Sequence, residues 1–323
     1  MGSEGKPQLQ ERVPIIDFEG FNGPNREKIR GEIAAACEMW GFFQLCNHGF
    51  DQDLMKRVKD VSKEFFYLPA EEKVKIRVMP DTIQGWSHSS LAATATKLSA
   101  GSTEYYHNIF KPLKEHLLPL NPPTFGSTWI EYFEQIQVLA ESVLALISES
   151  LNLPSDTLVK SMRGPTSGSP YLANRVNYYP PRKATDDPLG VPSHSDPVAI
   201  TFLLADDVAG LEVNKDDKWV EVEPIQNAFI INIGDQLEIL TNGKFASVDH
   251  RGMPSKDPDQ ERLTLAAFYS ADDDRVVAPL QELLDESHPP LYSACTFKEY
   301  MAKFTARGLD GKKGIESMHI EHE

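Results

Sequence analysis

The sequence predicts an α+β fold in which helices pack on a core made mainly of β-strands. Segments with helical periodicity fill the first half of the chain, and short apolar segments separated by turn residues fill residues 170–270. Closely spaced short strands are typical of a sandwich, a jelly roll or a barrel. We expect one domain over residues 1–323, with a helix-rich portion at about 10–155, the β core at about 170–270 and a helical C-terminal segment at about 275–323.

The helices are predicted from the spacing of apolar residues. Ile29, Ile33 and Cys37, for example, recur on one face of a helix. The same reasoning predicts helices at residues 24–38, about 51–66, 128–151 and about 296–308. Thr128 and Glu131 have the spacing of a capping box, which would start the third of these helices.

The strands are predicted from short apolar or alternating segments bounded by turn residues. They lie at residues 13–18, 41–46, 175–179, 198–204, 211–213, 219–222, 228–233, 245–251 and 262–269. Gly234-Asp235 is expected to form a turn. Residues 78–126 show neither period, and an irregular segment of that length is usually functional or mobile.

Composition narrows the function classes. The net charge of −16, from 48 acidic and 32 basic residues, argues against a nucleic-acid partner and against docking on an anionic membrane. Three widely spaced cysteines without a CxxC motif fit a reducing compartment. With a polar N-terminus and no apolar run of 18 residues, we expect a cytoplasmic monomer that acts on a small molecule.

The most informative short motif is His194-Ser195-Asp196. In an extended segment, the first and third side chains point to the same face. One more nitrogen ligand would complete a set of two histidines and one carboxylate, which holds ferrous iron and leaves positions open for oxygen chemistry. His250 is the best of the nine histidines for this role, because it lies in a β-like segment 56 residues further on. Alone, an HxD tripeptide is a weak signal.

Arg262 and Thr264 supply a second signal. Their side chains share one face of the strand expected at 262–269, and an arginine can bind a carboxylate with two parallel hydrogen bonds. The alternative is an ordinary surface salt bridge. Together with the HxD motif and a distal histidine, the Arg-x-Thr pair is far more specific than any one part.

At this point the chain resembles the plant-type 2-oxoglutarate- and Fe(II)-dependent dioxygenases, over almost its whole length. The resemblance lies in Val13-Pro14-Ile15-Ile16-Asp17, Trp40 to Gly49 (WGFFQLCNHG), Asn177-Tyr178-Tyr179-Pro180-Pro181, His194-Ser195-Asp196, Gly234 to Glu238 (GDQLE), Thr241-Asn242-Gly243-Lys244, His250-Arg251 and Arg262-Leu263-Thr264. These motifs are ordered and correctly spaced.

The resemblance implies a double-stranded β-helix, or jelly roll, with N-terminal and C-terminal helices packed on it. It implies Fe(II) on His194, Asp196 and His250. It further implies that 2-oxoglutarate is held by Arg262, Thr264, Tyr179 and Asn177; the family usually carries Ser at the position of Thr264. O2 is then the other co-substrate and ascorbate the expected reductant. The implied reaction couples decarboxylation of 2-oxoglutarate to succinate with hydroxylation or desaturation of a second molecule.

The substrate pocket is expected to include Phe268, Tyr106, Tyr105, Arg175, Phe297 and Met301. His107 lies beside the two tyrosines, and the C-terminal helix with Tyr300 and Phe304 would form a lid or simply pack on the barrel.

An aromatic, partly polar pocket favours a planar small molecule such as a flavanone, as in flavonoid biosynthesis and related specialised metabolism. Alternatives within the family are a hormone or alkaloid oxidase and an ascorbate-dependent, ethylene-forming type of oxidase. From another class, a non-catalytic jelly-roll binder or a zinc hydrolase stays open.

Overall fold

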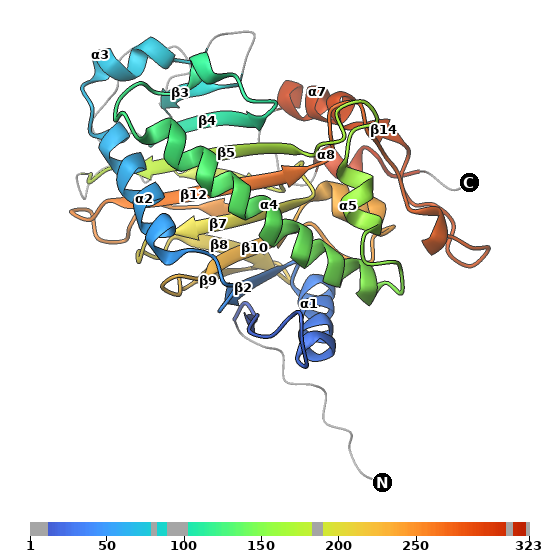
Figure 1. Cartoon of the computed structure of the whole chain (residues 1–323). Coiled ribbons are helices and arrows are strands. Elements are labelled where there is room, and N and C mark those ends of the chain that lie inside the picture. Colours follow the sequence, from blue (N-terminus) through green and yellow to red (C-terminus); the bar gives the residue numbers. More distant parts are fainter. Residues whose placement is uncertain (1–11, 79–82, 89–102, 183–189, 308–312, 321–323) are drawn as a thin grey trace.

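Figure 1 shows the protein as a computed structural model, which describes residues 12–78, 83–88, 103–182, 190–307 and 313–320. Its α+β architecture confirms the expected fold class. The helices are α1 (Arg26–Met39), α2 (Gln52–Phe66), α3 (Ala70–Lys73), α4 (Phe125–Ser150), α5 (Thr157–Met162), α6 (Asp235–Leu240), α7 (Phe297–Arg307) and α8 (Lys313–Glu316).

The strands of the described residues form two main sheets and one short pair. The larger sheet has the order β1-β2-β10-β7-β12-β5-β4-β3, and the smaller one has the order β6-β11-β8-β9. The bounds are β1 Ile15–Asp17, β2 Phe42–Cys46, β3 Gly85–His88, β4 Glu104–Lys111, β5 Tyr171–Tyr179, β6 Val191–His194, β7 Ile200–Ala205, β8 Leu211–Lys215, β9 Lys218–Val222, β10 Phe229–Ile233, β11 His250–Gly252, β12 Arg262–Ser270, β13 Val276–Val277 and β14 Cys295–Thr296.

The two main sheets face each other, as a jelly roll requires. Phe42 and Ile230 of the larger sheet pack in one buried cluster with Leu211, Val213 and Val222 of the smaller sheet. Sheets that pack face to face in this way bury the alternating inward side chains of both. The space between them is where the polar residues predicted from the motifs come together.

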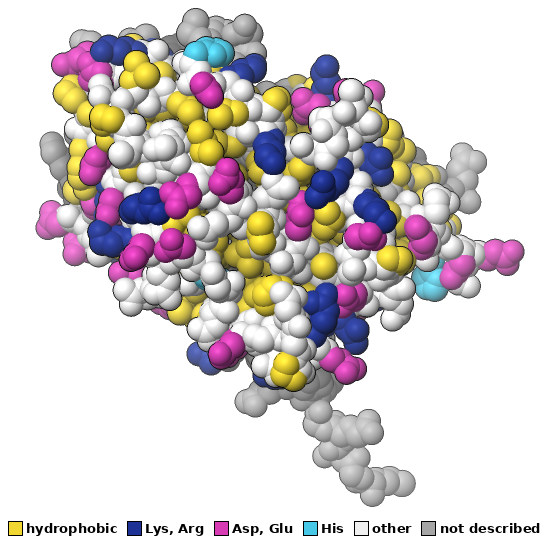
Figure 2. Space-filling model, viewed as in Figure 1, with side chains coloured by type: hydrophobic (Ala, Val, Ile, Leu, Met, Phe, Trp, Pro, Cys, Tyr) yellow, Lys and Arg dark blue, Asp and Glu magenta, His cyan; other side chains and the backbone are white. Residues whose placement is uncertain are grey.

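The outer face of the larger sheet is covered by α2 and α4, and α1 packs against α4 beside β1 and β2 (Figure 1). Helix α4 buries Trp129, Tyr132 and Ile136 completely. These helices and the sheet thus share the main hydrophobic core, because each has one apolar face that needs covering. On the molecular face of Figure 2, acidic and basic side chains are interspersed and do not gather into one basic area.

Four local predictions were wrong. Helix α4 begins at Phe125, so Thr128 lies inside its first turn and the expected capping box does not exist; Glu131 instead forms an ion pair with Arg57 at 2.9 Å. The segment 78–126 contains β3 and β4, which extend the larger sheet.

The other two errors lie close to the motifs. Gly234-Asp235 does not turn the chain but starts α6, and of the strand expected at 245–251 only β11 is extended. Short helices and three-residue strands carry too few residues to show a period, so their assignment depends on tertiary contacts. In the part of the chain that the structure describes, no helix is long and apolar enough to cross a membrane.

Candidate functional site

The site is built where the smaller sheet brings two distant histidines together. His194 is the last residue of β6 and pairs directly with His250, the first residue of β11. Asp196 follows β6 by two residues, and its Oδ1 lies 3.5 Å from His194 Nε2 and 3.7 Å from His250 Nε2. One ligand atom from each of the three residues lies within 4.8 Å of the others. The structure therefore brings together the three residues that the HxD motif and the distal histidine predicted.

Both imidazoles are fixed by their own backbone. His194 Nδ1 lies 2.8 Å from the carbonyl oxygen of Pro192, and His250 Nδ1 lies 3.0 Å from that of Val248. A carbonyl only accepts, so each Nδ1 carries the proton and each Nε2 presents a lone pair toward Asp196. This arrangement is the usual support of metal-binding histidines.

The carboxylate of Asp196 is held from its other side. Its Oδ2 accepts hydrogen bonds from the Thr201 hydroxyl at 2.6 Å and from the Asn232 amide at 2.8 Å. The sequence reasoning missed both residues. Asn232 left a signal, since a polar residue within the apolar run 228–233 must find a buried partner.

Protonation suits the binding of a cation. Burial lowers the pKa of His250 to about 4, and the adjacent His194 adds to this effect, so the His250 ring is neutral near pH 7. Burial alone would raise the pKa of Asp196, but His250, His194 and the Thr201 hydroxyl hold it well below the usual range of a carboxyl. Nitrogen lone pairs and one carboxylate oxygen fit a first-row divalent metal such as Fe(II).

Beside this cluster, β12 and β5 bring together four further predicted residues. In their antiparallel register Arg262 lies opposite Tyr179, and Thr264 lies opposite Asn177. All four line one small cavity of about 70 Å³ that His194, Asp196 and His250 also line. Gly252 has to be glycine here, because a Cβ would lie 2.6 Å from the Tyr179 hydroxyl.

Arg262 is the most heavily buried cation of this cavity. Its side chain is 2% exposed, and it donates to the carbonyl oxygens of Val208 at 3.2 Å and Met253 at 3.0 Å. Its guanidinium lies over the Tyr179 ring, 4.9 Å from the centroid. Among the described residues, none of the ion pairs includes Arg262. A buried guanidinium that has only carbonyl partners suits an anionic ligand with a carboxylate.

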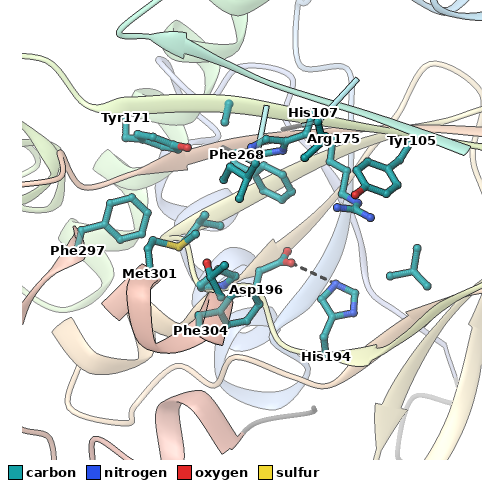
Figure 3. A pocket seen from close by; sticks show the side chains of 17 residues that line it. Tyr105, His107, Tyr171, Arg175, His194, Asp196, Phe268, Phe297, Met301 and Phe304 are labelled. Atoms are coloured by element: carbon teal, nitrogen blue, oxygen red, sulfur yellow. Dashed lines mark ion pairs between the residues drawn. The ribbon is translucent and has the colours of Figure 1, made fainter. Parts of the chain in front are cut away.

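A larger cavity of about 410 Å³ opens on the other side of His194 and Asp196 (Figure 3). It is lined by Val78, Ile83, Tyr105, His107, Tyr171, Ala173, Arg175, Val191, His194, Asp196, Pro197, Val198, Phe268, Phe297, Met301, Phe304 and Thr305. The predicted Tyr105, Arg175, Phe268, Phe297 and Met301 are thus all in its wall. In Figure 3, Phe297, Met301 and Phe304 lie across the cavity from Arg175 and Tyr105.

Arg175 is the one arginine or lysine in the described wall of this mainly apolar cavity. Its guanidinium stacks on Tyr105 at 3.9 Å from the ring centroid, and its Nε donates to Asn177 Oδ1 at 3.1 Å. It takes part in none of the ion pairs between described residues. His107 lies opposite Arg175 in the β4–β5 ladder. Its Nε2 is buried and has no hydrogen-bond partner among the described residues.

Tyr106 was wrongly predicted to line the pocket. Strand side chains alternate, so Tyr106 points to the face opposite Tyr105 and His107. It is completely buried in the core, where its ring packs against Phe65 and Phe125 at 5.4 and 5.3 Å.

Tyr300 also faces away from the cavity, although it shares α7 with residues that line it. Conversely, the wall residues Tyr171 and Ala173 were missed. The period of two that joins Arg175 to Asn177 on β5 also runs back through them and could have found them.

Comparison with known proteins adds independent findings. Residues 170–271 match the family described as the 2OG-Fe(II) oxygenase superfamily. Residues 13–123 match the N-terminal family described as non-haem dioxygenase in morphine synthesis.

Curated relatives match along most of the chain. Jasmonate-induced oxygenase 2 of Arabidopsis thaliana is 37% identical over 95% of this chain and 83% of its own length. Flavonol synthase/flavanone 3-hydroxylase of the same plant is 34% identical over 89% of this chain and 84% of its own length.

The solved structures agree with the sequence relatives. The crystal structure of JOX2 in complex with 2OG, Fe and JA has a TM-score of 0.84 and 36% identity, and covers 96% of this chain and 90% of that one. Two family matches, relatives above 30% identity and a shared jelly-roll fold lead to one conclusion. The chain belongs to the 2OG-Fe(II) oxygenase superfamily and is a plant-type dioxygenase dependent on Fe(II) and 2-oxoglutarate.

Proposed function

We propose that His194, Asp196 and His250 hold the Fe(II). The proposal is supported by the two lone pairs and the carboxylate oxygen that converge within 4.8 Å, with both imidazoles fixed through Nδ1. Fe(II) held there supplies the activation of O2 that is coupled to decarboxylation of 2-oxoglutarate. The contribution of the chain is to fix the ligands and to keep them neutral or anionic as the metal needs.

Arg262, Thr264, Tyr179 and Asn177 are then the residues that hold 2-oxoglutarate. The guanidinium of Arg262 binds its distal carboxylate, and Tyr179 and Thr264 offer hydroxyls to the same group. Thr264 keeps the hydroxyl of the usual serine, and its side chain lines the small cavity. Because this cavity is narrow and its cation is buried, it excludes water and fixes the co-substrate in one orientation.

The substrate is a small, mainly apolar molecule that carries one anionic or strongly hydrogen-bond-accepting oxygen. The single observation that carries this choice is Arg175, a cation that lines an aromatic cavity and takes part in no ion pair between described residues. The Asp196 carboxylate of the same wall accepts hydrogen bonds from Thr201 and Asn232 instead. An isolated buried charge is costly unless a ligand completes it. Arg175 would orient the molecule, while Phe268 and Tyr105 pack against its rings or chains.

Two substrate classes fit this description. The aromatic wall favours a planar phenolic compound such as a flavanone, and a flavanone-oxidising enzyme is among the relatives. Arg175 favours a carboxylic acid hormone, and a relative of similar overall identity has been solved with JA. We rank the acid first, because its carboxylate would form an ion pair with Arg175, whereas with a neutral flavanone the guanidinium would have Asp196 as a negative neighbour but no ion pair.

The test is turnover by the purified enzyme with Fe(II), 2-oxoglutarate and ascorbate. The substrate panel comprises carboxylic acid hormones, their methyl esters and flavanones, with succinate and product followed by mass spectrometry. Hydroxylated or desaturated product from an acid but not from its ester supports the ranking. Turnover of flavanones alone would reverse it, and oxidation that needs ascorbate but no 2-oxoglutarate would contradict the assigned co-substrate.

A further inference from the structure

The loop that carries the proposed metal ligands is supported from behind by α6. The backbone N–H of Asp235 donates to the carbonyl oxygen of Asp196 at 2.8 Å, and that of Gln236 donates to Val198 at 3.1 Å. Gly234 must be glycine at this contact, because a Cβ there would lie against the carbonyl oxygens of Val198 and Asp196. The first turn of α6 thus sets the path of the backbone at the ligands.

The side chain of Asp235 contacts the same loop. Asp235 is completely buried, and its Oδ2 accepts a hydrogen bond from Ser195 Oγ at 3.3 Å. Ser195 stands between the two ligands His194 and Asp196 and is 1% exposed. A displacement of the Asp235 carboxylate would therefore move the residue that joins the two ligands.

The same oxygen of Asp235 accepts a second hydrogen bond, from Tyr300 on α7. The distance from Tyr300 Oη to Asp235 Oδ2 is 2.7 Å, and Tyr300 is 3% exposed. Phe297, Met301 and Phe304 of the same helix form one wall of the substrate cavity (Figure 3). A buried path of three side chains therefore joins the substrate wall to the metal loop.

We propose that Tyr300 and Asp235 are positioning residues that tie helix α7 to the metal-ligand loop through Ser195. The inference rests on the proposed iron ligands and goes beyond them. Packing of a substrate against Phe297 and Met301 is transmitted to the spacing of His194 and Asp196, because the three side chains between them are buried and hydrogen-bonded in series. None of these three residues belongs to the proposed metal ligands, and none lines the substrate cavity.

The chain offers a matched control in Tyr292. This tyrosine is also 3% exposed, and its hydroxyl donates to Glu238 of α6 at 2.8 Å. Tyr292→Phe and Tyr300→Phe thus each remove one buried hydrogen bond between a C-terminal tyrosine and a carboxylate of α6. Of the two carboxylates, only Asp235 contacts the loop that joins His194 to Asp196, whereas Glu238 accepts from the backbone N–H of Ser247 in the segment before His250.

The experiment measures the Kd of Mn(II), a redox-stable substitute for Fe(II), by anaerobic titration of the full chain with 2-oxoglutarate present. We expect Tyr300→Phe and Ser195→Ala to raise this Kd about 3- to 10-fold, less than the roughly 10- to 100-fold loss caused by removing a direct partner of a metal ligand, because these side chains contact no ligand side chain themselves. Tyr292→Phe should leave it within about twofold while lowering Tm as much as Tyr300→Phe does, because each variant loses one comparable bond. In Tyr300→Phe the enzyme should also release more succinate per molecule of oxidised substrate, because decarboxylation of 2-oxoglutarate is then less tightly coupled to substrate oxidation.

Equal Kd values for the two tyrosine variants would overturn the proposal, and so would an unchanged Kd in Tyr300→Phe. If Tyr300→Phe does not fold, Ser195→Ala decides in the same assay. Equal Mn(II) binding by the wild type and His194→Ala would instead show that the proposed metal site itself is wrong. The two failures are therefore distinguishable.

Discussion

The two cavities that meet at His194 and Asp196 are built in different ways. The smaller one, on the side of Arg262, is walled by strands of both sheets, and its polar groups are fixed by backbone carbonyls and by strand register. The larger one, on the side of Phe297, takes much of its wall from β4 and α7 and is mainly apolar. Arg175 and Phe268 line both.

This difference shows how the fold separates chemistry from choice of substrate. Hydrogen bonds between adjacent strands fix the relative positions of the residues that they carry. Such a rigid arrangement suits the binding of metal and co-substrate, which needs precise geometry. Helix α7, which lies outside the sheets, can change without altering that ladder. We therefore expect substitutions in the two cavities to affect different kinetic constants.

The largest effect is expected from removing His194 or Asp196, the two proposed metal ligands that line both cavities. In His194→Ala or Asp196→Ala, only two ligand atoms of the cluster remain, so we expect metal binding to be lost and oxygen-dependent turnover to fall by about a thousandfold or more. Metal content after anaerobic loading and succinate release measure the two effects. His116→Ala, at an exposed histidine in the turn Glu115–Leu117, is the control and should match the wild type. Full turnover by either ligand variant would refute the assignment.

Arg262→Ala should affect the small cavity alone. Loss of a charge-assisted, two-point contact with a carboxylate predicts an increase of about 100-fold in the KM for 2-oxoglutarate, with little change in the Kd of the primary substrate. Steady-state kinetics at varied 2-oxoglutarate measure it. Arg57→Ala, which breaks a surface ion pair with Glu131, should leave the KM unchanged. An unchanged KM in Arg262→Ala would place the carboxylate contact elsewhere.

Arg175→Met should affect the choice of substrate most, because the guanidinium of Arg175 lies over Tyr105 in the large cavity; the change also removes the hydrogen bond to Asn177 beside the small cavity. It keeps the apolar stem and removes the cation, so kcat/KM for an acidic substrate should fall by about 30-fold, as expected for one lost charged hydrogen bond. The methyl ester of the same acid is the internal control and should lose less than about threefold. Equal losses for acid and ester would show that Arg175 acts through its contacts with Tyr105 and Asn177 and not through a charge pair with the substrate.

The contrast between the cavities also explains what the sequence could and could not predict. Short, closely spaced motifs on strands carried His194, Asp196, Arg262 and Thr264, because a period of two fixes which side chains share a face. The same rule, had it been applied to residues 104–111, would have separated Tyr105 from Tyr106.

The supporting contacts were beyond sequence reasoning for a different reason. Asn232 and Tyr300 meet Asp196 and Asp235 across 36 and 65 residues of chain. Such pairs depend on sheet order and on the docking of α7, which no local period records. A buried polar residue in an apolar run reveals that a partner exists, but not which one.

The smallest expected effect concerns the wall beside Arg175 and appears as a pH dependence of stability. Burial, with Arg175 as a second cause, lowers the pKa of His107 to about 3, whereas an unfolded chain has a histidine pKa of about 6.5. Below pH 6.5 the unfolded state therefore takes up a proton that the folded state refuses. The stability present above pH 6.5 is lost progressively as the pH falls toward 3.

His107→Leu removes this proton uptake and should flatten the acid side of the stability profile. Between pH 7.5 and 5 the wild type should lose about 2 kcal/mol more of its free energy of unfolding than the variant does, as linkage between pKa values of about 3 and 6.5 requires. Urea unfolding of the metal-free protein at the two pH values measures the difference, and His116→Leu, at an exposed position, should behave as the wild type. If His107→Leu loses as much stability as the wild type, the His107 ring becomes charged in the folded state, and the large cavity then carries a second cation beside Arg175. A second positive charge in the wall would favour an acidic substrate further and would weigh against a neutral flavanone.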